Sequence, residues 1–267
     1  IQFKKGLPFL SKVKRKKRYT HPNFSTMQFE LELIATTVDI CKIAKQSGAT
    51  RIELCTGLCE GGTTPSEGLI RGALRNAGIP VYVMIRPRGG DFFYSDMEFE
   101  TMLEDVVHCK QLGADGIVTG ILNKDGSIDK KRNLKMVERA FPLGVTFHRA
   151  FDRALNPEQT VKDILDCGFE RILSSGQMPT VVEGQNLIKD LVQKFGNEII
   201  IMPGSGINEK NIEEIAITTG ATQFHLSAKK SIPSQMDYNN PSMRETGENP
   251  TIDFEMISLV AKKLAAL

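Results

Sequence analysis

From residue 28 onward, short runs of β-branched residues alternate with longer amphipathic runs, and the alternation occurs eight times. Short β-branched runs are typical of buried strands, and apolar residues at every third or fourth position are typical of helices. Strands are predicted at 28–35, 51–55, 80–86, 115–119, 143–148, 170–174, 198–202 and 222–226. Helices are predicted near 38–47, 66–77, 96–112, 130–140, 157–167, 181–195, 208–218 and 253–265.

Eight β-then-α units in about 240 residues match the size of a closed barrel. Four glycines precede strands in similar segments, namely SGATRIEL, LGADGIVT, CGFERILS and TGATQFHL, as expected where helices end in a left-handed residue. The competing fold is a doubly wound open sheet, but no G-x-G-x-x-G follows the first strand. We therefore predict an α/β protein, a single-domain (β/α)8 barrel of TIM type over residues 28–267. Residues 229–250 are predicted to be a long polar loop after the eighth strand, either a lid or a mobile segment.

Basic residues crowd the start of the chain, although the formal net charge of the whole is only +2. We expect residues 1–27 to be a basic, disordered leader. The alternative is a nuclear-localisation signal or a patch for an acidic surface. The small net charge argues against nucleic acid as a partner, and no apolar run has the length of a membrane span. We expect a cytoplasmic protein, with a nuclear location as the alternative.

The five cysteines are odd in number and widely spaced, so reduced thiols are expected. Cys55 and Cys59 follow the second strand and form the one pair close in sequence. Soft thiolates favour Cu(I), which two of them can hold. The alternative is that both behave as ordinary free thiols.

Polar residues stand at the ends of the predicted strands, where the working residues of a (β/α)8 barrel lie. His148 is the first acid–base candidate, because a histidine exchanges protons near neutral pH and Asp152 follows it closely. Glu32 and Glu53 are the other catalytic candidates. The alternative is a neutralised structural set of these glutamates with arginine and histidine in the barrel core.

Glycines after the seventh strand expose backbone N–H groups, and the loops after strands seven and eight hold phosphate in many barrels. Arginine forks bind carboxylates and phosphates in two-pronged fashion. The alternative is that these glycines only permit a tight turn. The predicted anion-binding residues are Arg86, Arg88, Asp91, Arg149, Ser175, Gly204, Ser205, Gly206, His225 and Ser227.

Several motifs resemble the CutC family, which is associated with copper homeostasis. They are RIELC at 51–55, EGGTTPS at 60–66, VMIRPRGGDFFYSD at 83–96, GADGIVTG at 113–120, VTFHRAFD at 145–152, RILSSG at 171–176 and MPGSGI at 202–207. The resemblance implies a TIM-like barrel, a role in intracellular copper handling, Cu(I) binding and assembly into homo-oligomers. It also implies thiols at the ends of strands one and two. Cys55 matches the second, but Ile34 occupies the first, so a two-thiol site needs Cys59 as the substitute.

Three hypotheses follow. The first is a copper homeostasis protein that binds Cu(I) through Cys55 and Cys59. The second is a barrel enzyme acting on a small anionic metabolite that carries phosphate or carboxylate. The third is a scaffold whose barrel mouth has no remaining chemistry. The fold alone does not choose among them.

Overall fold

The computed structural model describes residues 29–238, 240–242 and 248–267, so the predicted leader at 1–27 lies outside the described residues. Eight strands form one sheet, and every adjacent pair is parallel. The strands are β1 (Glu30–Ala35), β2 (Arg51–Leu54), β3 (Val81–Met84), β4 (Gly116–Thr119), β5 (Gly144–Phe147), β6 (Arg171–Ser174), β7 (Ile200–Pro203) and β8 (Gln223–Leu226).

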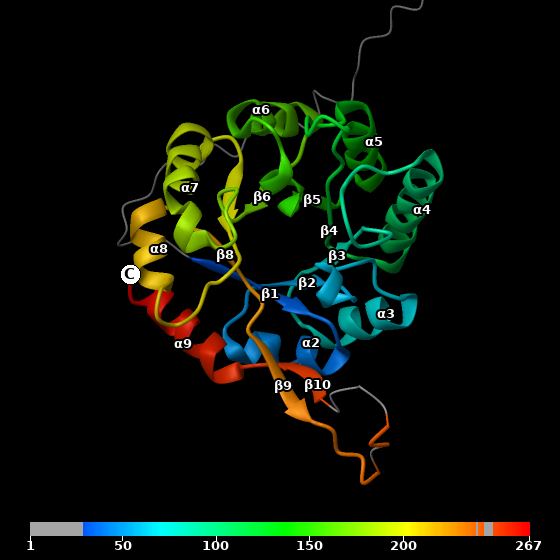
Figure 1. Cartoon of the computed structure of the whole chain (residues 1–267), viewed down its shortest axis with the longest axis vertical. Coiled ribbons are helices and arrows are strands. Elements are labelled where there is room, and N and C mark those ends of the chain that lie inside the picture. Colours follow the sequence, from blue (N-terminus) through cyan, green and yellow to red (C-terminus); the bar gives the residue numbers. More distant parts are fainter. Residues whose placement is uncertain (1–28, 239, 243–247) are drawn as a thin grey trace, which may run out of the picture.

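The hydrogen-bonded order runs from β7 down to β1 and then to β8, and β7 and β8 contact each other. The sheet therefore curls into a ring, as Figure 1 shows, with the helices outside it. The predicted TIM-type barrel is confirmed, and all eight predicted strands are present within two residues of their predicted starts.

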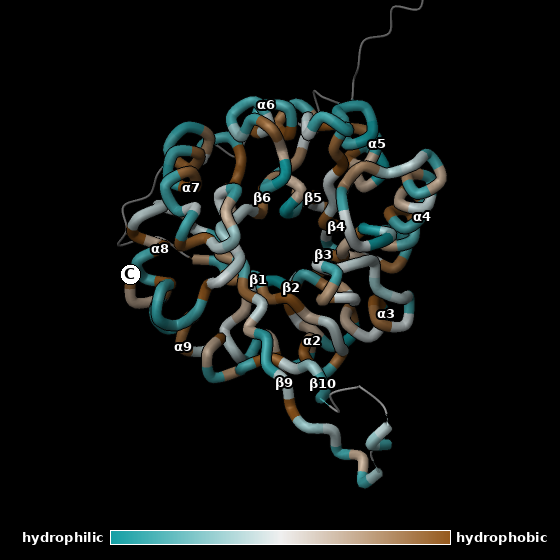
Figure 2. Tube along the Cα trace, viewed as in Figure 1, coloured by the Kyte–Doolittle hydropathy of each residue, from teal (hydrophilic) through white to brown (hydrophobic). Residues whose placement is uncertain are grey.

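Each strand is followed by a helix that packs its apolar face on the barrel. Figure 2 shows hydrophilic segments along the outer rim of these helices. Their bounds are α2 (Val38–Ala44), α3 (Glu67–Asn76), α4 (Asp96–Leu112), α5 (Lys130–Ala140), α6 (Pro157–Cys167), α7 (Val181–Phe195), α8 (Ile212–Thr219) and α9 (Phe254–Ala265). Three short 3₁₀-helices complete this set: η2 (Lys45–Ser47), η3 (Leu58–Glu60) and η4 (Arg149–Arg153).

The start of α8 differs from its predicted place. The helix begins at Ile212 rather than near residue 208, because the amide oxygen of Asn211 accepts a hydrogen bond from the Asn208 N–H and closes a separate turn first. The predicted glycine ends are confirmed, since Gly48, Gly113 and Gly168 all adopt the left-handed conformation after their helices.

The segment after β8 is not a plain loop, which corrects the prediction for 229–250. β9 (Lys229–Pro233) pairs with β10 (Glu248–Ile252) as an antiparallel ribbon. The ribbon extends away from the barrel in Figure 1, and β9 is exposed along its whole length. Part of the predicted loop, residues 239 and 243–247, lies outside the described residues. Nowhere in the described chain does a helix have both the length and the apolar character needed to cross a bilayer.

Candidate functional site

A cavity of about 490 Å³ opens at the carboxyl ends of the strands. Its lining comes from strand ends and from the loops that follow them, which is where barrels place their ligands. It combines cationic, acidic and apolar side chains: Ile34, Glu53, Leu58, Glu60, Met84, Arg86, Phe92, His148, Arg149, Arg153, Leu173, Ser205, Ile207, His225, Ser227 and Lys229, with Gly61, Gly90 and Gly206. Glu53, Arg86, His148 and the 205–206 loop therefore meet at one cavity, although they are far apart in sequence.

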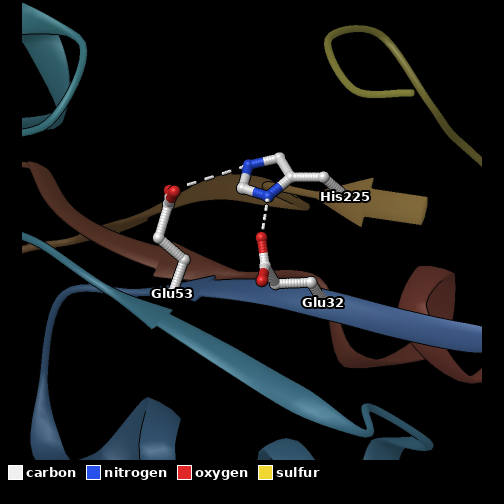
Figure 3. Close-up of side chains that lie close together, drawn as sticks. All are labelled: Glu32, Glu53 and His225. Carbon is white, nitrogen blue, oxygen red and sulfur yellow. Dashed lines mark hydrogen bonds and ion pairs between the residues drawn. The ribbon is translucent and has the colours of Figure 1, made fainter. Parts of the chain in front are cut away.

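Glu32, Glu53 and His225 form a buried cluster at the base of this cavity, and one atom of each lies within 4.8 Å of the others. Figure 3 shows the imidazole between the two carboxylates. The distance from His225 Nδ1 to Glu32 Oε1 is 2.8 Å, and His225 Nε2 lies 3.8 Å from Glu53 Oε2. Glu53 Oε1 is buried and has no hydrogen-bond partner among the described residues. Such a set of oxygen and nitrogen donors is able to hold a hard or borderline metal ion or to transfer protons.

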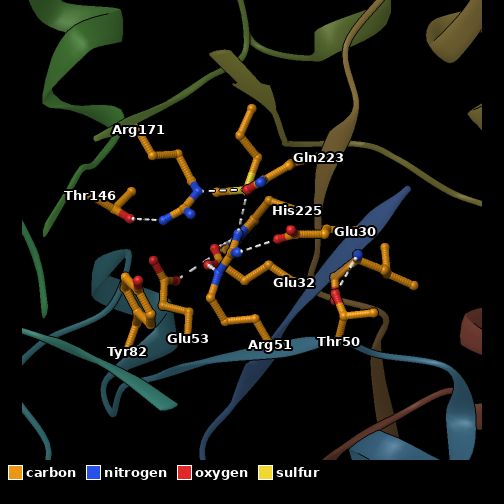
Figure 4. Close-up of polar contacts among 12 residues, drawn as sticks. Glu30, Glu32, Thr50, Arg51, Glu53, Tyr82, Thr146, Arg171, Gln223 and His225 are labelled. Atoms are coloured by element: carbon orange, nitrogen blue, oxygen red, sulfur yellow. Dashed lines mark hydrogen bonds and ion pairs between the residues drawn. The ribbon is translucent and has the colours of Figure 1, made fainter. Parts of the chain in front are cut away.

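Below this cluster the interior is filled by a network of paired charges (Figure 4). Arg51 donates to Glu32, Glu30 and Gln223, and Arg171 donates to the same Gln223 oxygen at 2.7 Å. Both guanidinium groups lie over the Tyr82 ring, at 5.4 and 5.3 Å from its centroid. The barrel is therefore closed beneath the cavity by groups that satisfy one another.

His148 and Arg86 line the neighbouring wall and both contact Phe92. The ring of Phe92 lies 4.7 Å from that of His148 and 5.0 Å from the Arg86 guanidinium carbon. Arg86 donates from Nη1 and Nη2 to the carbonyls of Glu60, Gly62 and Gly90, so most of its guanidinium holds loops together. Burial, with Arg86 as a second cause, lowers the pKa of His148 to about 3. His148 is therefore neutral over the physiological range.

Asp152 and Ser175 lie beside the cavity without lining it. The Asp152 carboxylate accepts from Arg149 Nε at 2.7 Å, from Ser174 Oγ at 2.6 Å and from the Ser175 N–H at 3.1 Å. Arg149 also donates to Ser175 Oγ at 2.7 Å. Because its oxygens are occupied in this way, Asp152 positions Arg149 at the rim. The predicted pairing of Asp152 with His148 is therefore not present.

The 204–206 loop follows β7 as predicted. A Cβ on Gly204 would lie 2.6 Å from Leu173 and 3.1 Å from His225, so a larger residue there would require both side chains to shift. Ser205 has φ +78° and Gly206 has φ +83°. The Ser205 hydroxyl donates to the Pro179 carbonyl at 2.9 Å, so the hydroxyl itself is engaged. Among the described residues no partner is found for the Ser205 and Gly206 N–H groups, and both residues line the cavity.

Four predicted anion-binding residues do not line the cavity: Ser175 and Gly204, which lie beside it, and Arg88 and Asp91. Arg88 donates to Glu98, to Asp91 at 3.2 Å and to the Phe93 carbonyl at 2.8 Å. Its guanidinium is thus used to anchor the start of α4.

The two candidate metal-binding thiols lie in contrasting environments. Cys55 is fully buried in an apolar cluster with Met84 and Val118, with Ile34 packed against it. Cys59 is exposed on η3. Burial, with a smaller effect of Glu53, raises the pKa of the Cys55 thiol well above its usual range. The thiol is therefore protonated at neutral pH.

Arg153 and Lys229 line the cavity, and the prediction did not include them. Lys229 continues the alternation of inward residues Gln223, His225 and Ser227 by two more positions, so a strand pattern extended past β8 would have found it. Arg153 stands in η4, directly after Asp152, and only the turn of that helix brings it to the rim.

A closed (β/α)8 barrel with a polar cavity at the carboxyl ends of its strands is the architecture of a small-ligand site in TIM-type proteins. The model of the CutC family matches residues 29–230, and the chain belongs to this family. The copper homeostasis protein cutC homolog of Mus musculus is 47% identical over 215 residues, which are 80% of this chain and 79% of that protein. The Homo sapiens homolog of the same name is 46% identical over the same shares. A solved CutC structure from Streptococcus agalactiae superposes with a TM-score of 0.69 at 35% identity, covering 74% of this chain and 98% of that one.

Proposed function

We propose that this chain acts in copper homeostasis, the role that the names of its mouse and human relatives state. Family membership over residues 29–230 and the identity to these relatives support this role. A cytoplasmic location and assembly into homo-oligomers belong to the same proposal.

Direct Cu(I) binding would fall to Cys55, with Cys59 as the second thiol. These residues fit a pair of thiolates poorly, because Ile34 supplies no sulfur, Cys55 is buried and protonated, and Cys59 is exposed. The test is a Cu(I) titration under reducing conditions of the wild type, Cys55→Ala and Cys55→Ala/Cys59→Ala. An unchanged stoichiometry in both variants would eliminate the thiol site, and loss of one bound Cu(I) in Cys55→Ala would establish it.

The chemistry that the geometry supports best is acid–base chemistry on a small anionic ligand, with the effect on copper being indirect. The observation that carries it is the cavity itself. Its cationic residues Arg86, Arg149, Arg153 and Lys229 outnumber its carboxylates, Glu53 and Glu60. Buried polar atoms of Glu53 and His148 also lack partners within the described chain. Native proteins seldom leave such atoms without a partner, so a ligand is the partner we infer.

The anion proposal is tested by calorimetric titration with 2-phosphoglycolate, a small anion that carries both a phosphate and a carboxylate. We expect binding that weakens with salt and about tenfold lower affinity in Lys229→Met and Arg153→Met, because each removes one charge-assisted contact. The matched control is Lys230→Met, since Lys230 pairs with Asp253 and does not line the cavity. Equal affinity in all three variants would refute the assignment of the cavity as the anion site.

A further inference from the structure

The buried cluster at the base of the cavity has features that anion binding alone does not require. β8, β1 and β2 are adjacent, and Glu32 is the register partner of both His225 and Arg51. Glu53 stands two residues beyond Arg51 and points the same way, into the barrel. Three neighbouring strands thus bring ligand atoms of two carboxylates and an imidazole within 4.8 Å of one another, with exposed fractions of 0%, 2% and 6% for Glu32, Glu53 and His225.

Glu32 determines which nitrogen of His225 carries a proton. Burial by itself would raise the pKa of Glu32, but Arg51 and then His225 lower it well below its usual range, so Glu32 is ionised. An ionised carboxylate 2.8 Å from Nδ1 accepts a hydrogen bond from Nδ1–H. His225 Nε2 is then directed at Glu53, as Figure 3 shows. Glu32 is a positioning residue, in the manner of the carboxylate that orients a catalytic histidine.

Glu53 is the group that faces the ligand. Its Oε2 lies 3.8 Å from His225 Nε2, and its Oε1 has no partner within the described residues. Burial raises the pKa of Glu53 to about 7, with the negative charge of Glu32 adding to the rise and with His225 and Arg51 opposing it. A carboxyl group that titrates near neutral pH both accepts and donates protons efficiently.

His148 provides the complementary group. Its Nδ1 accepts from the Ala150 N–H at 3.2 Å, so the neutral ring carries its proton on Nε2. That Nε2 is buried and has no partner in the described part of the chain. A neutral imidazole N–H is suited to stabilise negative charge that develops on an oxygen, and it is unsuited to act as a base here.

We propose that Glu53, backed by His225, abstracts a proton from the carbon next to a carbonyl in a small anionic metabolite, while His148 Nε2–H hydrogen-bonds the carbonyl oxygen. The C–H bond breaks and its proton passes to Glu53. The electron pair forms the C=C bond of an enolate, whose charge rests on the oxygen held by His148. Return of the proton from Glu53 to the same carbon regenerates the carbonyl, so the reaction is a reversible enolisation that exchanges this hydrogen and needs no other reactant. Arg149, Arg153 and Lys229 hold the anionic end. This inference rests on the proposed anion-binding function.

A metal ion is the competing occupant of Glu53 and His225. The cationic wall of the cavity disfavours a cation there, and Arg51 and Arg171 already lie beside the cluster. The proton-transfer assignment is therefore the one that the surrounding charges support.

The experiment follows hydrogen exchange in D₂O with dihydroxyacetone phosphate, a phosphorylated compound with exchangeable C–H bonds next to a carbonyl. Proton NMR should show loss of the C–H signal faster with protein than in buffer. We expect at least a 100-fold slower rate in Glu53→Gln and about 100-fold in His148→Asn, with Lys230→Met unchanged. Binding of 2-phosphoglycolate or dihydroxyacetone phosphate without exchange would overturn this inference and leave the anion site intact. Binding of neither would overturn both.

A second measurement needs no ligand. The chain has only four histidines, so ¹⁵N spectra can follow His225 through a pH titration. The charged groups facing it are Glu32 on β1 and Arg51 and Glu53 on β2. We expect its titration to shift down by about one pH unit in Glu53→Gln, because the neighbouring negative charge is lost. An identical titration of His225 in wild type and variant would overturn the proposed interaction between Glu53 and His225. Binding of Zn²⁺ at Glu53 and His225 with micromolar affinity would also overturn it.

Discussion

At the amino end of the barrel interior, Arg51 and Arg171 meet Glu32, Gln223 and Tyr82 in contacts that satisfy them all. At the carboxyl end, Glu53 and His148 are just as deeply buried, yet each keeps an atom without a partner in the described chain. Both ends carry polar groups in a barrel core, where unsatisfied groups are costly. The comparison teaches that burial of charge does not by itself identify a site. The unsatisfied atoms, placed where a cavity gives access to them, separate the functional end from the structural end.

The largest effect is expected from disrupting the hydrogen-bonded charge network at the amino end of the barrel. Arg51→Met leaves the Glu32 carboxylate buried without its main counter-charge, and we expect the free energy of unfolding to fall by about 3–5 kcal/mol. Urea denaturation measures this loss. The control is Arg71→Met, whose pair with Glu67 is exposed on α3 and is screened by solvent, so its loss should change stability little. Comparable losses in the two variants would show that the network does not stabilise the barrel.

At the carboxyl end of the barrel, His148 is expected to make the free energy of unfolding depend on pH. Its pKa in the folded protein, about 3, is below the ordinary histidine value of 6.5, so the unfolded chain binds a proton first as the pH falls. The stability due to neutral His148 is complete above pH 6.5 and is lost toward pH 3, at roughly 1 kcal/mol per pH unit. His148→Asn should remove this slope between pH 6.5 and 4.5, as measured by urea denaturation at several pH values. Parallel curves for wild type and variant would contradict the buried neutral state.

Glu53→Gln is expected to make the protein more stable. The pKa of Glu53 is raised from 4.5 to about 7, so its favourable protonated state is complete below pH 4.5 and is lost as the pH rises through 7. At pH 8 the neutral amide of Gln replaces the buried charge of Glu53, and we expect the free energy of unfolding to rise by about 1–2 kcal/mol. At pH 4.5 the gain should vanish. A loss of stability at pH 8 would mean that Glu53 is satisfied in the free protein and belongs with the structural end.

Local patterns were sufficient for the fold. Strand and helix positions follow from apolar spacing and from glycines such as Gly113 and Gly168, because those signals depend only on near neighbours in sequence. The ribbon of β9 and β10 was missed because all of β9 and the first three residues of β10 are exposed, so no alternation of apolar and polar residues marks them as strands.

The site was predicted less completely, for a physical reason. Strand ends located Glu53, His148 and His225 correctly at the cavity, because parallel strands share one carboxyl end. The partners of a side chain depend on loop geometry, which spacing does not reveal. Arg88, which was predicted to bind an anion, therefore donates to Glu98 instead. Arg153, which was not predicted, lines the cavity.

The smallest effect concerns the two thiols beside the site, and it sharpens the contrast between buried and accessible groups. Cys59 is exposed, whereas Cys55, Cys41, Cys109 and Cys167 are buried and burial raises the pKa of each of these four thiols. Native protein should therefore react with a disulfide reagent such as DTNB at one thiol quickly, and Cys59→Ser should abolish that fast phase without changing stability by more than about 0.5 kcal/mol. Denatured protein should release all five. A fast phase that survives in Cys59→Ser and disappears in Cys55→Ala would place Cys55 in contact with solvent and reopen its role as a Cu(I) ligand.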